Sequence, residues 1–186
     1  MRTRDFDKQK RIKDAMISLI LKEGINGASV GKIAREAGVS PATIYVYYES
    51  KEHMLAEVFS EYVQSSFRYL SDSITPDISA ADLIEAVVRA TYQYAQEHEE
   101  IFSFVEQCSC CPTIRENFCP SDCCKDVYDL IHAFQKKGVI RPCSDMTITA
   151  ALYGPVNYMV AHKQYYSDPD AELDNLIGLL QRALLY

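Results

Sequence analysis

Apolar residues recur along almost the whole chain at the three- and four-residue spacing of an α-helix. The first such stripe consists of Ile12, Ala15, Met16, Leu19 and Ile20. It predicts a helix with one buried face, which Gly24 is expected to end. The same spacing predicts helices over residues 80–96, 99–108, 144–161 and 169–184, and one that begins at Ser121 or Asp122 and ends at Gly138. No alternating strand pattern stands out, so we predict an all-α fold.

Two of these predicted helices have apolar stripes on which later conclusions depend. In the helix over residues 99–108 the expected inner face is Ile101, Val105 and Cys108. In the last helix the expected stripe is Leu173, Leu176, Ile177, Leu180 and Leu184. Each set spans neighbouring turns of one helix face, so each is predicted to pack against another helix.

Short helices with clear start signals occupy the region between residues 29 and 55. Ser29 is placed as the N-cap of a helix that ends at Gly38, and Ser40 as the N-cap of the next one. Pro41 then stands at the first helical position, where a missing N–H costs nothing. Ser50 is expected to cap a long fourth helix that reaches about Leu70.

Residues 29–48 therefore have the organisation of a helix-turn-helix, two short helices joined by a tight turn at Gly38. In this motif the second helix lies in the major groove of DNA. Helical spacing directs Ile44 and Tyr48 inward and leaves Tyr47 ambiguous. The residues expected to face DNA are Pro41, Ala42, Thr43, Tyr45 and Val46.

Three residues in and beside this motif have two possible roles each. The Tyr45 ring can pack on a sugar or a thymine methyl while its hydroxyl donates to a phosphate, or it can cover a neighbouring helix. Lys51, in the first turn of the long helix, can bind a phosphate together with the helix N-terminus, or it can be an ordinary solvated lysine. The Ser29 hydroxyl can reach a phosphate as well as cap its helix.

The stretch ASVGKIAREAGVSPATIYVYYESKEHML resembles the DNA-binding region of the TetR family of bacterial transcriptional regulators. The resemblance covers about residues 6–66. The matching positions are Ser29, Ile33-Ala34, Ala37-Gly38-Val39-Ser40, Thr43, Ile44-Tyr45, Tyr47-Tyr48, Ser50-Lys51-Glu52 and Met54-Leu55. The chain departs from the family pattern at Val46, where many members carry a histidine, and at Ala42, which replaces a common glycine.

The resemblance implies a transcription regulator that binds double-stranded DNA, typically a repressor and not an enzyme. It implies a helix-turn-helix DNA-binding domain over residues 1–51 and a helical domain over residues 52–186 that binds an effector and dimerises. Members are typically homodimers on a pseudopalindromic operator. Their last two long helices form the dimer interface, and the stripe on residues 173–184 fits that use.

Charge is distributed unevenly along the chain, whose formal net charge is -7. Residues 1–55 carry ten Lys/Arg and seven Asp/Glu, a balance of 10 − 7 = +3, whereas residues 56–186 carry nine and nineteen, a balance of 9 − 19 = -10. A basic N-terminal segment followed by an acidic one favours contact of the N-terminal segment with the phosphates of nucleic acid. The polar N-terminus and the lack of a long apolar run predict a cytoplasmic protein without a membrane partner.

Six of the seven cysteines lie between residues 108 and 124, and three interpretations of them remain. They can be small buried apolar groups, soft metal ligands, or a redox-sensing set of thiols. The weak candidates for metal or redox chemistry are Cys110, Cys111, Cys119 and Cys123. A thiol or metal enzyme is the rival class, but the four histidines are scattered and no Gly-rich phosphate loop occurs. We expect no cofactor.

The effector is unknown, and aromatic residues are the only candidates for its pocket. These residues are Tyr92, Phe102, Tyr128, Phe134, Tyr153 and Tyr158. Aromatic side chains at helical spacing can line a ligand cavity, but they can equally be plain core.

Overall fold

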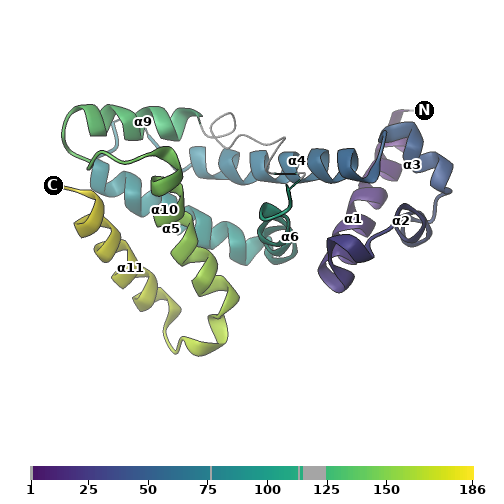
Figure 1. Ribbon diagram of the computed structural model, residues 1–186. Coiled ribbons are helices and arrows are strands. Elements are labelled where there is room, and N and C mark those ends of the chain that lie inside the picture. Colours follow the sequence, from purple (N-terminus) through teal and green to yellow (C-terminus); the bar gives the residue numbers. More distant parts are fainter. Residues whose placement is uncertain (1, 76, 113, 115–124) are drawn as a thin grey trace. The chain divides into compact units, whose positions relative to one another are not determined.

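The computed structural model describes residues 2–75, 77–112, 114 and 125–186, with side chains from residue 6 onward. Its helices are α1 (Arg2–Gly27), α2 (Val30–Ala37), α3 (Pro41–Tyr47), α4 (Lys51–Ser71), α5 (Ala80–Glu97), α6 (Glu99–Ser109), α9 (Lys125–Lys136), α10 (Asp145–Ala161) and α11 (Pro169–Leu184), with a 3₁₀ turn at Lys163–Tyr165 (Figure 1). The described β-structure is one isolated bridge between Ile140 and Leu185. The predicted all-α fold is confirmed.

The helices pack into two compact units. The head unit contains α1, α2, α3, α6 and α4 as far as Val63, and the body unit contains α4 from Gln64 onward, α5, α9, α10 and α11. A division by packing does not test which residues bind DNA or an effector, so the division predicted at residue 51 stays a prediction. One difference from that prediction is that α6 packs against α1 in the head unit.

Glycine and serine set the helix ends of the head unit as the sequence predicted. Gly24 has φ 76° and ψ 170°, which breaks the helical conformation within α1, although the last turn continues to Gly27. The Ser29 hydroxyl caps α2, and the Ser50 hydroxyl accepts from the backbone N–H of His53 at 3.0 Å at the start of α4. Local hydrogen bonds of this kind satisfy donors that a helix start leaves open.

The centre of the head unit is apolar and closely packed. Ile12, Met16 and Ile20 of α1 are fully buried, as are Ile33 of α2 and Met54 of α4. A salt bridge between Lys13 and Glu61 joins α1 to α4 at the surface. The inner face predicted for α6 is wrong in part. Phe104 and Cys108 are buried, whereas Ile101 and Val105 are only half-buried, because α6 turns Phe104 toward Tyr62 of α4 with ring centroids 6.4 Å apart.

Tyr48 is buried in this core with 2% of its surface exposed. Its hydroxyl has no hydrogen-bond partner among the described residues. Burial, helped by the nearby carboxylates of Glu57 and Glu61, raises the pKa of Tyr48 from 10.0 to about 12. The ionised form is therefore disfavoured in the folded state.

Tyr48→Phe is expected to match the wild type in stability at pH 8, or to exceed it by up to about 1 kcal/mol, because the lost hydroxyl has no described partner. Above pH 10 the unfolded wild type loses the Tyr48 proton while the folded state keeps it, so wild-type stability falls as the pH approaches 12. The variant lacks this loss, which is worth about 1 kcal/mol at pH 11. Urea unfolding of both proteins at pH 8 and pH 11 measures the difference, and a gap that does not widen would contradict the burial of this phenol.

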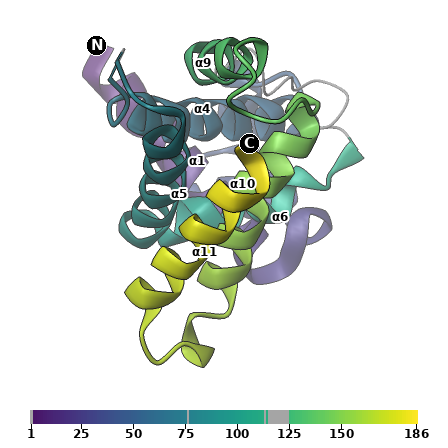
Figure 2. The same cartoon turned by 90° about the vertical axis from the view of Figure 1, so that its left-hand side faces the viewer.

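The body unit has its own core, formed by α5, α10 and α11. Buried residues of α5 (Leu83, Val87), α10 (Leu152, Val156) and α11 (Ile177) belong to one cluster. Figures 1 and 2 show α10 and α11 beside each other in opposite directions, with α11 returning toward the C-terminus. An ion pair of Arg89 on α5 with Asp174 on α11, at 2.5 Å, joins these helices at the surface.

The stripe expected to form a dimer interface on the last helix lies in this core instead. Leu173, Ile177, Leu180 and Leu184 are each at most 8% exposed, and Leu176 is half-buried. The interface prediction was wrong for the four buried residues, because an apolar stripe shows that a helix face is buried but not which helix covers it. The face of α11 that remains open carries Leu179, which is 57% exposed.

None of the helices in the described part of the chain combines the length and the apolar composition required to span a lipid bilayer.

Candidate DNA-binding surface

The turn between α2 and α3 is closed by backbone hydrogen bonds. Gly38 takes the left-handed conformation with φ 65°, which side chains with a Cβ rarely adopt. Its N–H donates to the Arg35 carbonyl at 3.2 Å, and the N–H of Val39 donates to the Ala34 carbonyl at 2.9 Å. These bonds end α2 and fix the direction in which the chain enters α3.

Ser40 and Thr43 form a hydrogen-bonded cap at the start of α3. The Ser40 hydroxyl accepts from the backbone N–H of Thr43 at 3.2 Å, and the two side-chain hydroxyls lie 2.9 Å apart. On the inner face of α3, Ile44 is 1% exposed and packs into the core of the head unit. The cap and this buried isoleucine hold one face of α3 inward and leave the opposite face to solvent.

That opposite face carries the residues predicted to contact DNA. Pro41 and Ala42 are exposed, Tyr45 is 58% exposed and Val46 is 78% exposed. Thr43 is half-buried beside its cap. The three neighbouring tyrosines thus separate into one buried residue, Tyr48, one half-buried residue, Tyr47, and one exposed residue, Tyr45.

Lys51 has a structural partner that the sequence did not reveal, whereas Ser29 forms the helix cap that the sequence predicted. The Lys51 ammonium donates to the Ile25 carbonyl at 2.9 Å, which joins the start of α4 to the end of α1. The Ser29 hydroxyl is exposed and accepts from the backbone N–H of Lys32 at 3.4 Å. The Lys32 side chain binds Glu23 at 2.5 Å and so braces the turn before α2. Sequence spacing gave no signal for this role of Lys32.

The two-helix motif, with one helix face exposed on a braced unit, defines a helix-turn-helix DNA-binding protein. Residues 12–58 match the family model for bacterial regulatory proteins of the tetR family. This part of the chain is thus a DNA-binding domain of the TetR family of transcriptional regulators, a family of DNA-binding proteins and not of enzymes.

Relatives of known sequence resemble the chain over different lengths. The fatty acid metabolism regulator protein of Bacillus subtilis is 33% identical over 86 residues, an alignment that spans only 44% of each protein. An uncharacterised HTH-type transcriptional regulator of Haemophilus influenzae is 27% identical over 98% of this chain and 97% of its own length.

Solved structures share the fold over nearly the whole chain. A TetR family regulator from Marinobacter aquaeolei has a TM-score of 0.84 and 22% identity, and covers 100% of this chain and 99% of its own. The transcriptional regulator FadR from Bacillus subtilis, solved in complex with stearoyl-CoA, has a TM-score of 0.72 and 20% identity, and covers 92% of this chain and 96% of its own.

The six aromatic residues proposed for an effector pocket do not come together. Tyr128 and Tyr153 line a small cavity of about 10 Å³ in the body core, and the Tyr153 ring packs on Phe67 with centroids 5.8 Å apart. Tyr92 is buried in the core of the same unit and Phe134 is half-buried on α9. The remaining two are elsewhere: Tyr158 is 61% exposed, and Phe102 lies on α6 of the head unit.

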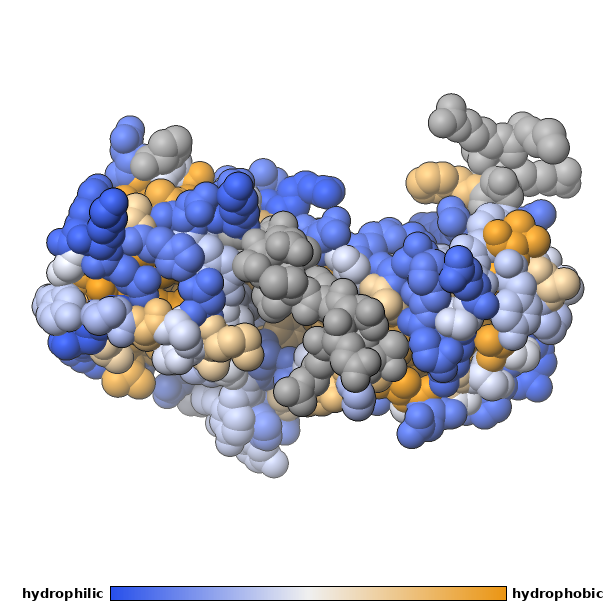
Figure 3. Space-filling view, turned by 45° about the horizontal axis from the view of Figure 1, so that its top comes forward, coloured by the Kyte–Doolittle hydropathy of each residue, from blue (hydrophilic) through white to orange (hydrophobic). Residues whose placement is uncertain are grey.

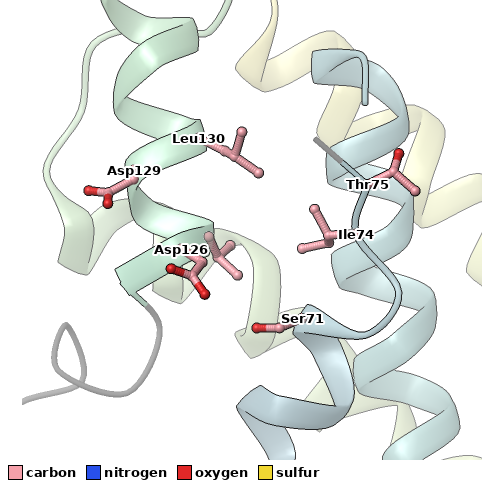
Figure 4. A pocket seen from close by; sticks show the side chains of 7 residues that line it. Ser71, Ile74, Thr75, Asp126, Asp129 and Leu130 are labelled. Atoms are coloured by element: carbon pink, nitrogen blue, oxygen red, sulfur yellow. The ribbon is translucent and has the colours of Figure 1, made fainter. Parts of the chain in front are cut away.

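A larger cavity of about 380 Å³ opens between the end of α4, the segment that follows it, and α9. In Figure 4 Ile74 and Leu130 face each other across it, Ser71 and Asp126 lie at one end, and Asp129 points away. Sequence patterns could not reveal this cavity, because its lining residues come from segments more than fifty positions apart.

Half of the cysteine candidates can be placed. Cys110 is exposed and Cys111 is half-buried, whereas Cys119 and Cys123 lie outside the described residues. The described residues contain no cluster of three or more His, Cys, Asp or Glu side chains suited to a metal ion. Cys108 is fully buried, and burial raises the pKa of its thiol from 9.0 to about 12, with a smaller contribution from Cys111.

Cys108 is expected to resist alkylation in the folded protein, because its thiol is buried and protonated at neutral pH. Cys110, two residues away and exposed, should react first and serves as the internal comparison. Peptide mapping after a brief treatment with iodoacetamide at pH 8 measures both, and repetition in urea confirms that Cys108 reacts when it is exposed. Equal labelling of the two thiols in the native protein would show that Cys108 is not buried.

Proposed function

We propose that this regulator is a cytoplasmic repressor that binds a pseudopalindromic operator as a homodimer and is released by a small-molecule effector. The observation that carries the proposal is the exposed face of α3, which is held outward by the Ser40 cap and the buried Ile44. The basic balance of residues 1–55 supports contact with phosphates.

The dimer interface is proposed on the open face of α10 and α11. Tyr158 and Leu179 are 61% and 57% exposed, and with Pro155, Tyr166 and Leu176 they border a depression of about 440 Å³. Exposed apolar groups gathered on neighbouring helices are typical of a protein–protein contact. The two-fold symmetry of such a dimer would present two copies of α3 to a palindromic site.

The effector is proposed to bind in the body unit. The cavity between α4 and α9 has the volume of an ordinary small-molecule site, and a relative of similar fold binds stearoyl-CoA. The Asp126 carboxylate beside this cavity, and the balance of -10 over residues 56–186, disfavour the phosphates of coenzyme A. We therefore propose an effector that is largely apolar and lacks phosphate groups.

A nuclease footprint on the DNA upstream of the protein's own gene tests the proposal. The expected result is a protected segment centred on an inverted repeat, lost when a suitable effector is added. Leu130→Trp, which fills the cavity, should keep the footprint and lose the response to that effector. A footprint without dyad symmetry would contradict the homodimer, and an unchanged response in Leu130→Trp would place the effector elsewhere.

A further inference from the structure

The exposed face of α3 is chemically unusual for a helix that reads DNA. Residues 41–47 read PATIYVY and contain no arginine, lysine, asparagine, glutamine, histidine, aspartate or glutamate. These are the side chains that usually hydrogen-bond to base edges, arginine or lysine to guanine and asparagine or glutamine to adenine. Four exposed residues form the face, and three of them, Pro41, Ala42 and Val46, carry only hydrocarbon side chains.

The two hydroxyls of α3 add little capacity for hydrogen bonds to bases. The Thr43 hydroxyl lies 2.9 Å from the Ser40 hydroxyl and is already part of the helix cap. The Tyr45 hydroxyl stands at the tip of a long exposed side chain, from which it can reach the sugar-phosphate backbone. The nearest lysine along the chain, Lys51, holds its ammonium on the Ile25 carbonyl.

The surface of the head unit also exposes apolar residues beyond α3. In Figure 3 apolar residues are exposed among hydrophilic ones in the unit drawn on the right, which contains the N-terminal helices. Val46 is 78% exposed, one of the most exposed large apolar side chains among the described residues. An apolar side chain on a groove-facing helix gains free energy only if something apolar covers it.

The apolar feature that base pairs present in the major groove is the 5-methyl group of thymine. We propose that α3 recognises its operator mainly through thymine methyl groups, which pack on Val46, Ala42, Pro41 and the Tyr45 ring. This inference rests on the proposed sequence-specific binding to DNA and specifies its chemistry. The helix lacks arginine and lysine, the side chains that usually pair with the O6 and N7 atoms of guanine, so this readout gives guanine no bidentate partner on α3.

Uracil substitution tests this inference, because deoxyuridine differs from thymidine only by the missing methyl group. A preferred duplex is first selected from a randomised pool with the full-length protein. Thymines in the selected half-sites are then replaced by deoxyuridine one at a time, and the dissociation constants are compared at fixed salt. Each methyl group that α3 covers should contribute about four-fold to affinity, the value of burying one methyl-sized group. Substitutions in the flanks, outside the half-sites, should have no effect and serve as the control.

A variant protein assigns the contact to a residue. Val46→Ala should lower affinity for the thymine duplex and abolish the uracil penalty at one position in each half-site, while the other penalties remain. Val139→Ala, the same change at an exposed valine of the body unit, should leave every penalty unchanged. Both sites are exposed, so neither change disturbs the core.

The possible outcomes distinguish a failure of the methyl readout from a failure of sequence-specific DNA binding itself. If uracil is tolerated at every half-site position of a tightly bound duplex, the methyl readout is overturned while specific DNA binding stands. If half-site contacts depend on guanine and not on thymine, the readout is also overturned. If the pool yields no preferred duplex, the proposed sequence-specific function itself fails.

Discussion

Ile177→Glu is expected to unfold the body unit, whereas Leu179→Glu is expected to leave it folded but monomeric. Ile177 is 4% exposed within the core formed with α5 and α10, so a glutamate there would bury an unpaired charge. The cost of such a burial exceeds about 4 kcal/mol, a large part of the stability of an ordinary domain. Leu179 lies two residues further along the same helix and is 57% exposed.

Leu179→Glu is therefore the matched control for Ile177→Glu. It should change the stability of the protomer by less than about 0.5 kcal/mol but place like charges across the proposed dimer interface. Circular dichroism measures the fold of both variants, and analytical ultracentrifugation at micromolar concentration measures the oligomeric state. A folded Ile177→Glu protein would contradict the core assignment. A dimeric Leu179→Glu protein would remove Leu179 from the interface.

Tyr45→Ala is expected to weaken operator binding by about 1–3 kcal/mol, the usual value of one groove contact, and Thr43→Ala is expected to weaken it less, because the Thr43 hydroxyl is engaged in the helix cap. The two changes differ in their effect on the fold. Tyr45 is exposed and its removal should not affect stability, whereas Thr43→Ala also removes a hydroxyl from the helix cap and should cost up to about 1 kcal/mol of stability.

Lys51→Ala provides the comparison for sequence-independent binding. A phosphate contact would weaken specific and nonspecific DNA alike and reduce the salt dependence of binding. Because the Lys51 ammonium also joins α4 to α1 through the Ile25 carbonyl, its loss should lower the melting temperature as well. Titration of labelled duplexes at several salt concentrations measures these effects. Tight, wild-type binding by the folded Tyr45→Ala and Thr43→Ala variants would show that neither side chain contacts the operator.

Local signals in the sequence predicted the head unit closely. The caps at Ser29, Ser40 and Ser50 and the left-handed Gly38 act within four residues along the chain, so the sequence contains the whole interaction. The same locality accounts for the exposed Tyr45 and the buried Tyr48, because Tyr48 follows Ile44 by about one helical turn, at the cap of α3, whereas Tyr45 directly follows Ile44 and lies on another face.

Interactions between distant segments were not predictable in the same way. The sequence correctly predicted that the apolar stripe on α11 is buried. The element that covers it, however, is α5 of the same protomer and not a second subunit. The burial of Phe104 depends on its contact with Tyr62, more than forty residues away. The cavity beside Ile74 and Leu130 likewise exists only once α9 packs near the end of α4. A single sequence contains no measure of such distances.

The ratio of two dissociation constants tests the central claim most directly. The selected duplex and a scrambled duplex of the same length and composition are titrated with the wild-type protein at one physiological salt concentration. A sequence-specific regulator should bind the selected duplex at least about 10³-fold more tightly. A ratio close to one would mean that the chain binds DNA only through its phosphates and would contradict sequence-specific regulation.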